Sequence, residues 1–313
     1  MPVRPPDWPD AVGTVQLFDL PNIGSPPAAT ARILIAAGGS NDGWRGADCW
    51  FVPAADAEPI ALGTVRPAAA LGTLAAPLAA GSEYLIDAVN QALVTLANPS
   101  MSLESIDDAA LLGGANRAMV GAELMQFGAA EPVGGNVWRI SRLLRGRAGT
   151  GSGGVHAAGA PFVLLGDSAL MLLPDALAEA AASGAAQLQW APRGGTAMTE
   201  VAVSAGGAAL RPLAPVHGRI SPDGAGGVRL SWRRRSRVDP GWRDHVDLPI
   251  GEGQEAWRIT LSPPVPGIAA WERTAADLHV TAAILANVPP GTMAEVRQVG
   301  DFALSPPLLL PLT

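Results

Sequence analysis

The residues with the clearest capacity for chemistry are four arginines that follow a predicted turn. Arg139, Arg142, Arg145 and Arg147 lie close together just after the turn at residues 134–136. Guanidinium groups bind carboxylates and phosphates through paired hydrogen bonds. These side chains are therefore candidates for contact with another subunit or with an acidic surface. In the alternative interpretation they are structural, because Ser-Arg-Leu-Leu-Arg-Gly also fits a strand that enters a tight turn, where arginines bind backbone carbonyls.

A second arginine cluster lies nearer the C-terminal end, where Arg233 and Arg235 are further candidates for surface contacts. Basic clusters can bind anionic polymers. However, the chain has a net charge of -7 and a pI of about 5.1, whereas nucleic-acid binding normally requires a net basic face. We therefore expect no nucleic-acid partner. The acids close enough in sequence to neutralise the cluster are Asp239, Asp244, Asp247, Glu252 and Glu255.

Two pairs of carboxylates could support hydrolysis of a glycan. Glu123 with Glu131, and Asp107 with Asp108, are the nominated pairs. Cleavage of a glycosidic bond requires two acids held about 5 to 10 Å apart across a cleft. The nine tryptophans could stack on sugars if they are exposed, although strand tryptophans usually belong to the core. A carbohydrate-binding or cell-wall-degrading module is therefore the alternative function.

Other catalytic and metal-binding patterns are missing from the sequence. The four histidines are widely separated, and the single cysteine, Cys49, is expected to be a small buried hydrophobe. All 21 basic residues are arginine, which removes Schiff-base and phosphate-loop lysine chemistry. No Gly-x-Ser-x-Gly motif and no ordered Ser, His and Asp set is present. The sequence thus predicts no catalytic residue, no metal site and no cofactor.

The length and composition predict a multidomain protein that does not insert stably into a membrane. A chain of 313 residues exceeds the usual size of one hydrophobic core. Its apolar runs are too short to cross a bilayer. The first ten residues, MPVRPPDWPD, lack the apolar segment of a secretory signal, so we expect assembly in the cytoplasm.

The elements that must position these residues are mostly short strands. Apolar segments recur at close spacing between Gly, Pro, Asn and Asp, and 37 glycines and 29 prolines leave little room for long helices. Residues 126–150 predict a hairpin around the glycine-rich turn. A short helix is expected at residues 105–118 with Ser105 as cap. Residues 174–182 favour a second helix through their alanines, but their position between two strand-like runs also fits a loop. The predicted fold class is mainly β, with tandem sandwich or barrel domains.

Three domains are expected: residues 1–99, residues 100–207 and residues 208–313. The Gly-, Ala- and Pro-rich stretch at residues 205–223 marks the second boundary. In the last domain, Val228, Leu230 and Trp232 alternate with polar residues, and the pattern repeats at residues 257–261. This spacing and an early inward tryptophan are typical of a sandwich similar to fibronectin type III.

Residues 111–150 contain the positions Asn116, Glu123, Gln126, Phe127, Ser141, Arg142, Leu143, Leu144, Arg145, Gly146, Gly149 and Thr150. At these positions the segment resembles the C-terminal region of the large tail-tip, or baseplate hub, protein of gene transfer agents and siphophages. Arg117 departs from the family pattern, which has alanine after the asparagine, and Pro161 to Leu165 continues the likeness. A second block at residues 230–259 resembles the fibronectin-like domain that ends the same family.

The resemblance implies a non-enzymatic structural protein of a phage-like virion, located at the distal tail. Its implied partners are copies of itself in a trimer, the baseplate hub, the distal tail proteins and the host cell envelope. Longer family members place hub domains and a TIM-barrel-like domain before this region, so the channel-forming role of the hub is not carried over. The role of residues 1–99 is not defined by the resemblance.

Overall fold

A computed structural model describes residues 10–23, 27–151, 154–166, 170–238 and 247–312. The fold is mainly β, as predicted. The chain divides into two compact units. The first comprises Met1–Pro21 and Thr30–Ala209, and the second comprises Asn22–Ala29 and Leu210–Thr313. Among the described residues, no helix has the length and apolarity needed to span a membrane.

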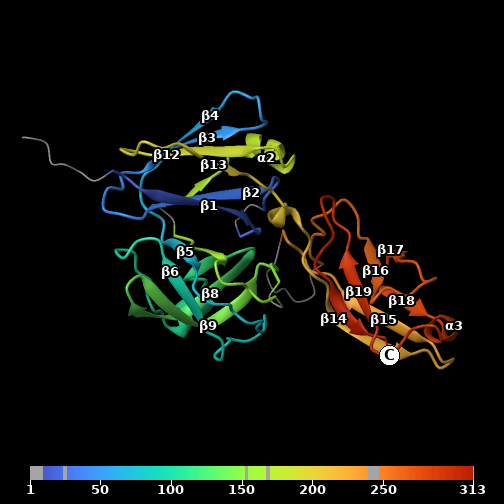
Figure 1. The fold of residues 1–313 in the computed structure, drawn as a ribbon. Coiled ribbons are helices and arrows are strands. Elements are labelled where there is room, and N and C mark those ends of the chain that lie inside the picture. The colour runs from blue at the N-terminus through green and yellow to red at the C-terminus, as the bar shows by residue number, and fades with distance from the viewer. Residues whose placement is uncertain (1–9, 24–26, 152–153, 167–169, 239–246, 313) are drawn as a thin grey trace, which may run out of the picture. The chain divides into compact units, whose positions relative to one another are not determined.

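The first unit contains two facing sheets, seen at the top of Figure 1. Ile33 and Ile35 from one sheet pack with Phe51 and Leu188 from the other. Cys49 is buried in the same core, and this burial raises the pKa of its thiol to about 11. One sheet contains β1 (Gly13–Leu20), β2 (Arg32–Gly39) and β11 (Leu170–Leu172). The other contains β13 (Thr199–Ala202), β12 (Gln187–Pro192), β3 (Ala47–Val52) and β4 (Ile60–Val65).

The first unit also contains a closed six-stranded barrel, below the sheets in Figure 1. Phe127, Leu143 and Phe162 fill its core and are fully buried. Along residues 92–96, buried Ala92, Val94 and Leu96 alternate with two partly buried residues, so every second side chain faces the core. In order around the barrel, the strands are β10 (Pro161–Leu164), β5 (Leu71–Leu74), β6 (Ala92–Leu96), β9 (Val137–Arg147), β8 (Glu123–Gly134) and β7 (Arg117–Val120).

The predicted hairpin is confirmed as β8 and β9. The two strands pair in antiparallel register, with Phe127 opposite Leu143. Gly134 and Gly135 have φ values of 144° and 59°, which glycine adopts without the steric penalty of a Cβ atom. The turn therefore requires these two glycines.

The first of the two predicted helices is shorter than expected, and the second has the expected extent. Helix α1 covers only Asp108–Leu112, and its cap is Asp107, which accepts a hydrogen bond from Ala110 N. The prediction that Ser105 caps this helix was wrong, because its hydroxyl donates to the carbonyl of Ala130 instead. Helix α2 (Asp175–Ala182) agrees with the second prediction.

Residues 1–99 and 100–207 do not form separate domains. Strands β5 and β6 from the first segment pair with β10 and β9 from the second, and β3 pairs with β12. The expected boundary falls in a turn of the barrel, where Asn98 Oδ1 accepts a hydrogen bond from Ser100 N. A turn signal looks the same between domains as between strands, so local pattern could not separate the two cases. The second unit resumes at Leu210, two residues after the predicted start of the third domain.

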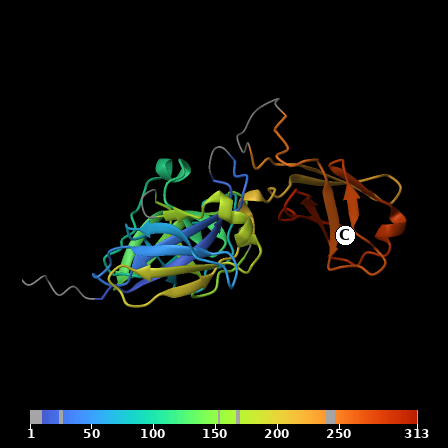
Figure 2. The ribbon, with the colours of Figure 1, turned by 90° about the horizontal axis from the view of Figure 1, so that it is seen from above.

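The second unit has three-stranded and four-stranded sheets, which Figure 2 shows from another side. Trp232 and Trp257 meet edge to face in its core, with ring centroids 5.6 Å apart. Asn22 joins this unit through a hydrogen bond from its Nδ2 to the carbonyl of Arg237. The three-stranded sheet contains β14 (Val216–Pro222), β15 (Val228–Arg233) and β18 (Asp277–Val280). The four-stranded sheet contains β17 (Trp271–Arg273), β16 (Trp257–Ser262), β19 (Met293–Gln298) and β20 (Leu308–Pro311). Helix α3 (Ala282–Leu285) follows β18.

Candidate functional site

The barrel contains a buried ion pair between the first residue of β8 and a residue near the end of β9. Arg145 Nε donates to Glu123 Oε1 at 2.7 Å, and Arg145 Nη2 donates to Glu123 Oε2 at 2.9 Å. The arginine is 0% exposed and the glutamate 4%. Because the guanidinium fork matches the carboxylate, the pair fixes the relative position of the two strands.

The Glu123 carboxylate has two further partners. Gly146 N donates to Oε1 at 2.8 Å, and His156 Nε2 lies 2.6 Å from Oε2. Burial alone would raise the pKa of Glu123, but the hydrogen bonds from His156, Arg145 and Gly146 hold this pKa below its usual range. The carboxylate is therefore kept ionised inside the barrel.

The ion pair also anchors the loop between β5 and β6, here called the anchored loop (residues 79–91). Arg145 Nη1 donates to the carbonyl of Ala79 at 2.9 Å. Asp87 exchanges two backbone hydrogen bonds with Leu143 of β9, at 2.8 and 3.0 Å. A Cβ atom on Gly81 would lie 2.5 Å from Asp87 Oδ2 and 3.2 Å from Arg145 Nη1. The loop thus packs closely on the buried pair.

Asp87 organises the rest of the anchored loop. Its Oδ1 accepts hydrogen bonds from the backbone of Val89 and Asn90, and its Oδ2 accepts one from Asn90 Nδ2 at 2.7 Å. Burial opposes ionisation of Asp87, yet the hydrogen bonds from Asn90 and Val89 and the charge of Arg145 lower its pKa. The loop conformation is held by charge-assisted hydrogen bonds at its base.

The anchored loop displays three apolar side chains to solvent. Tyr84 is 83% exposed, Leu85 70% and Val89 87%. Single exposed apolar residues are common, but three on one fixed loop are typical of an interaction surface. The exposed apolar side chains of the loop can therefore contact another macromolecule, whereas the charged groups at its base bind within the barrel.

The four arginines of the predicted contact segment have different surroundings. Arg145 fits the structural alternative and not an external contact, because its guanidinium is enclosed and binds Glu123 and the carbonyl of Ala79. Arg142, at a φ of 57°, forms an ion pair with Asp108. Arg139 lies 3.5 Å from Glu131 on the exposed part of the hairpin, and Arg147 is exposed. These three remain candidates for subunit contact.

The second arginine cluster is mostly engaged within its own unit. Arg235 Nε donates to the carbonyl of Ala214 at 2.8 Å, whereas Arg233 is exposed and lines a pocket. Of the acids expected to neutralise the cluster, Asp247 and Glu255 lie near Arg234, and Glu252 pairs with Arg237. Asp239 and Asp244 lie outside the described residues.

The nominated carboxylate pairs do not form a cleft. Glu123 is buried, and Glu131 is exposed at the hairpin tip. Asp107 caps α1, and Asp108 binds Arg142. The residues needed for acid and base catalysis by either pair are thus used in structural contacts.

A pocket of about 340 Å³ brings two other carboxylates near a tryptophan. Asp247 and Glu255 lie 2.6 and 3.7 Å from the Arg234 guanidinium, so an arginine binds both rather than leaving them to face an open cleft. Trp232 is only 2% exposed, and no tryptophan in the described ranges is exposed. No group of three or more metal-ligating side chains occurs in the same ranges.

Asp87 and His156 were not recognised from the sequence. The only signal was local: Asp87 with Asn90 three residues later fits an aspartate-centred turn. His156 is held near Glu123 by its own backbone bridge to Leu78, and this contact depends on the closure of the barrel. Pairing of that kind has no signal in a short sequence window.

Comparison with known proteins connects the barrel with one family. The model of the family described as "Rcc01698-like, C-terminal" matches residues 69–163. This range contains all six strands of the barrel, except that it ends one residue before Leu164, the last residue of β10. No curated protein matches the chain. A solved structure, the rat CD45 extracellular region, domains d3-d4, is similar at 10% identity over 37% of this chain and 55% of that one. Its TM-score is 0.23, too low to support a conclusion.

Proposed function

We propose that this chain is a structural protein of the tail tip or baseplate of a phage or a gene-transfer-agent-like particle. The observation that carries the proposal is the anchored loop, which presents Tyr84, Leu85 and Val89 on a base fixed by Asp87 and Arg145. The loop belongs to the segment that matches the Rcc01698-like family. The role proposed is assembly and contact with the host surface.

The barrel geometry favours contact over catalysis. A catalytic carboxylate must reach its substrate, whereas Glu123 is buried and binds Arg145, Gly146 and His156. Buried ion pairs can hold a single conformation even where they add little net stability. Here the pair holds a loop whose apolar residues are available to a partner.

We further propose that the second unit is a fibronectin type III-like domain. Among its described residues, seven strands form sheets in the orders β14-β15-β18 and β17-β16-β19-β20, around the Trp232 and Trp257 pair. A two-sheet antiparallel sandwich with an inward tryptophan is the arrangement such domains have. This supports the likeness of residues 230–259 to the last domain of the tail-tip family.

The proposed partners are copies of the same chain in a trimer, the baseplate hub, the distal tail proteins and the host cell envelope. Symmetric assembly repeats each contact. Weak contacts made by the anchored loop of each copy would then combine into stronger overall binding. The proposed location is the distal tail of the virion, after assembly in the host cytoplasm.

Substitution of one loop residue tests the contact role. Leu85→Ser should remove the chain from purified particles, because serine removes apolar contact area from the proposed interface. Leu112→Ser is the matched control: Leu112 is 69% exposed, lies in the same unit and is outside the loop. Immunoblots of purified particles measure incorporation. Equal incorporation of both variants at the wild-type level would contradict the contact role of the loop.

A further inference from the structure

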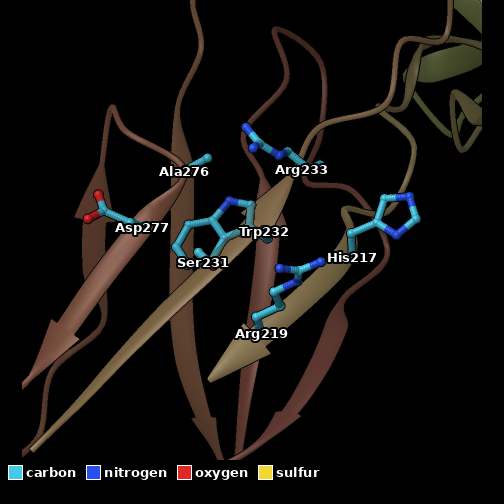
Figure 3. A pocket seen from close by; sticks show the side chains of 7 residues that line it. All are labelled: His217, Arg219, Ser231, Trp232, Arg233, Ala276 and Asp277. Carbon is cyan, nitrogen blue, oxygen red and sulfur yellow. The ribbon is translucent and has the colours of Figure 1, made fainter. Parts of the chain in front are cut away.

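The outer face of the three-stranded sheet in the second unit carries a pocket of about 580 Å³. Arg219 of β14 pairs with Ser231 of β15, which in turn pairs with Asp277 of β18, so these residues form one row across the sheet. The short side chain of Ser231 leaves a hollow between two longer neighbours. Figure 3 shows Arg219 and His217 on one side of Trp232 and Asp277 on the other.

The pocket has a positive end whose arginines form no ion pair with any described residue, since the nearby acids Asp247 and Glu255 of the adjoining cavity bind Arg234 instead. Within the described ranges, no ion pair involves Arg219 or Arg233, and both are exposed. They occupy diagonal positions on neighbouring strands, where Cα atoms lie about 7–8 Å apart. Like charges at this separation repel each other, which makes the pair unfavourable in the absence of an anion. Other arginines of the unit bind carboxylates, including Arg229, Arg234, Arg237, Arg258 and Arg297.

A β-bulge directs a third nitrogen-bearing side chain to the same end. The register shifts between Val216 and Arg219, so two residues of β14 lie opposite the single residue Trp232. His217, in the bulge, has a φ of 53°, a left-handed conformation that is unfavourable for a residue with a Cβ atom. Bulges commonly redirect side chains next to binding sites, and the imidazole of His217 lines this pocket.

The opposite end of the pocket has acceptor character. The Asp277 carboxylate binds Arg229 at 3.0 Å through one oxygen, Oδ2. A carboxylate has about four acceptor positions, so Asp277 retains capacity for hydroxyl donors. The Ser231 hydroxyl between the two ends can donate or accept. The pocket also adjoins the cavity of about 340 Å³ near Arg234, with which it shares Trp232, Arg233 and Ala276.

We propose that this pocket binds an acidic sugar. Arg219, Arg233 and His217 bind its carboxylate or phosphate group, and Ser231 and Asp277 bind its hydroxyl groups. The volume of about 580 Å³ is in the range of ligand pockets and is larger than a lone anion requires. The inference is independent of the tail-tip proposal, because it rests only on side chains of the second unit.

Binding to the full chain can be measured by calorimetry at low salt with four probes. Glucuronic acid and glucose 6-phosphate test the two acidic groups, glucose tests the sugar without charge, and inorganic phosphate tests the charge without sugar. We expect either acidic sugar, or both, to bind more tightly than glucose and inorganic phosphate. No binding of either acidic sugar would overturn the proposal, and so would equal binding of glucose or of inorganic phosphate.

Substitutions locate the site. Arg233→Gln and, separately, Arg219→Gln should each weaken acidic-sugar binding by about tenfold, since each removes one charge-assisted contact. The matched control is Arg211→Gln, at an exposed position of the same unit outside the pocket. Circular dichroism and thermal unfolding verify that each variant is folded. If the two pocket variants bind as tightly as the control, or if the control loses as much affinity, the assignment to this pocket is wrong.

Discussion

In the barrel, Arg145 is fully buried and bound to Glu123, whereas in the second unit Arg233 is exposed at an open pocket. Both belong to arginine-rich segments that look alike in sequence. A buried guanidinium that binds a buried carboxylate, as Arg145 binds Glu123, holds two strands and a loop together. One left exposed without a carboxylate is available to a ligand. The role of an arginine here is thus set by burial and by the nearest acid.

The largest expected difference between the two regions is in stability. Arg145→Ala leaves the Glu123 carboxylate buried without its cation, which typically costs about 3–5 kcal/mol. Arg233→Ala removes an exposed side chain and should change the free energy of unfolding by no more than about 0.5 kcal/mol. Urea unfolding followed by circular dichroism measures both. Equal effects of the two substitutions would contradict the contrast between the regions.

A smaller effect is expected when the anchored loop is crowded. Gly81→Ala places a methyl group against Asp87 Oδ2 and Arg145 Nη1 and should destabilise the chain by about 1–3 kcal/mol through overpacking. Gly154→Ala is the control, since a Cβ atom there meets nothing within 4 Å. Thermal unfolding compares them. A Gly81→Ala variant as stable as its control would mean that the loop does not pack on the buried pair.

Acid should weaken the barrel through Glu123. Its folded pKa is below the ordinary value of 4.5 because His156, Arg145 and Gly146 bind the ionised carboxylate. The stability from this ionisation is complete above pH 4.5 and is lost as the pH falls through the lower folded pKa. Glu123→Gln should therefore lose less stability on acidification than wild type, with Glu131→Gln as control. Parallel pH profiles of wild type and Glu123→Gln would contradict this linkage.

The smallest effect concerns the strained residue of the second unit. His217→Gly relieves the positive φ of 53° and should be more stable than His217→Ala by about 1 kcal/mol, because alanine retains the steric penalty. Thermal unfolding of the two variants measures the difference. If the alanine variant is the more stable, residue 217 does not hold this conformation.

Features encoded in short windows were predictable from the sequence. The hairpin followed from glycines at residues 134 and 135, and β15 followed from the alternation at Val228, Leu230 and Trp232. Features made by distant segments were not. The contact of Arg145 with Glu123 depends on the register of β8 and β9, and the placement of β5 and β6 depends on closure of the barrel. Arg219 was not singled out because its importance comes from its neighbour across the sheet, Ser231.

The central claim, a structural role at the distal tail, is tested most directly by locating the chain on intact particles. A peptide tag after Thr313, detected with gold-labelled antibody in electron micrographs, marks its position. We predict gold at the distal end of the tail and none on the capsid. Two results would contradict the claim. In the first, free protein in the lysate is labelled but the particles are not; in the second, the label lies on the capsid alone.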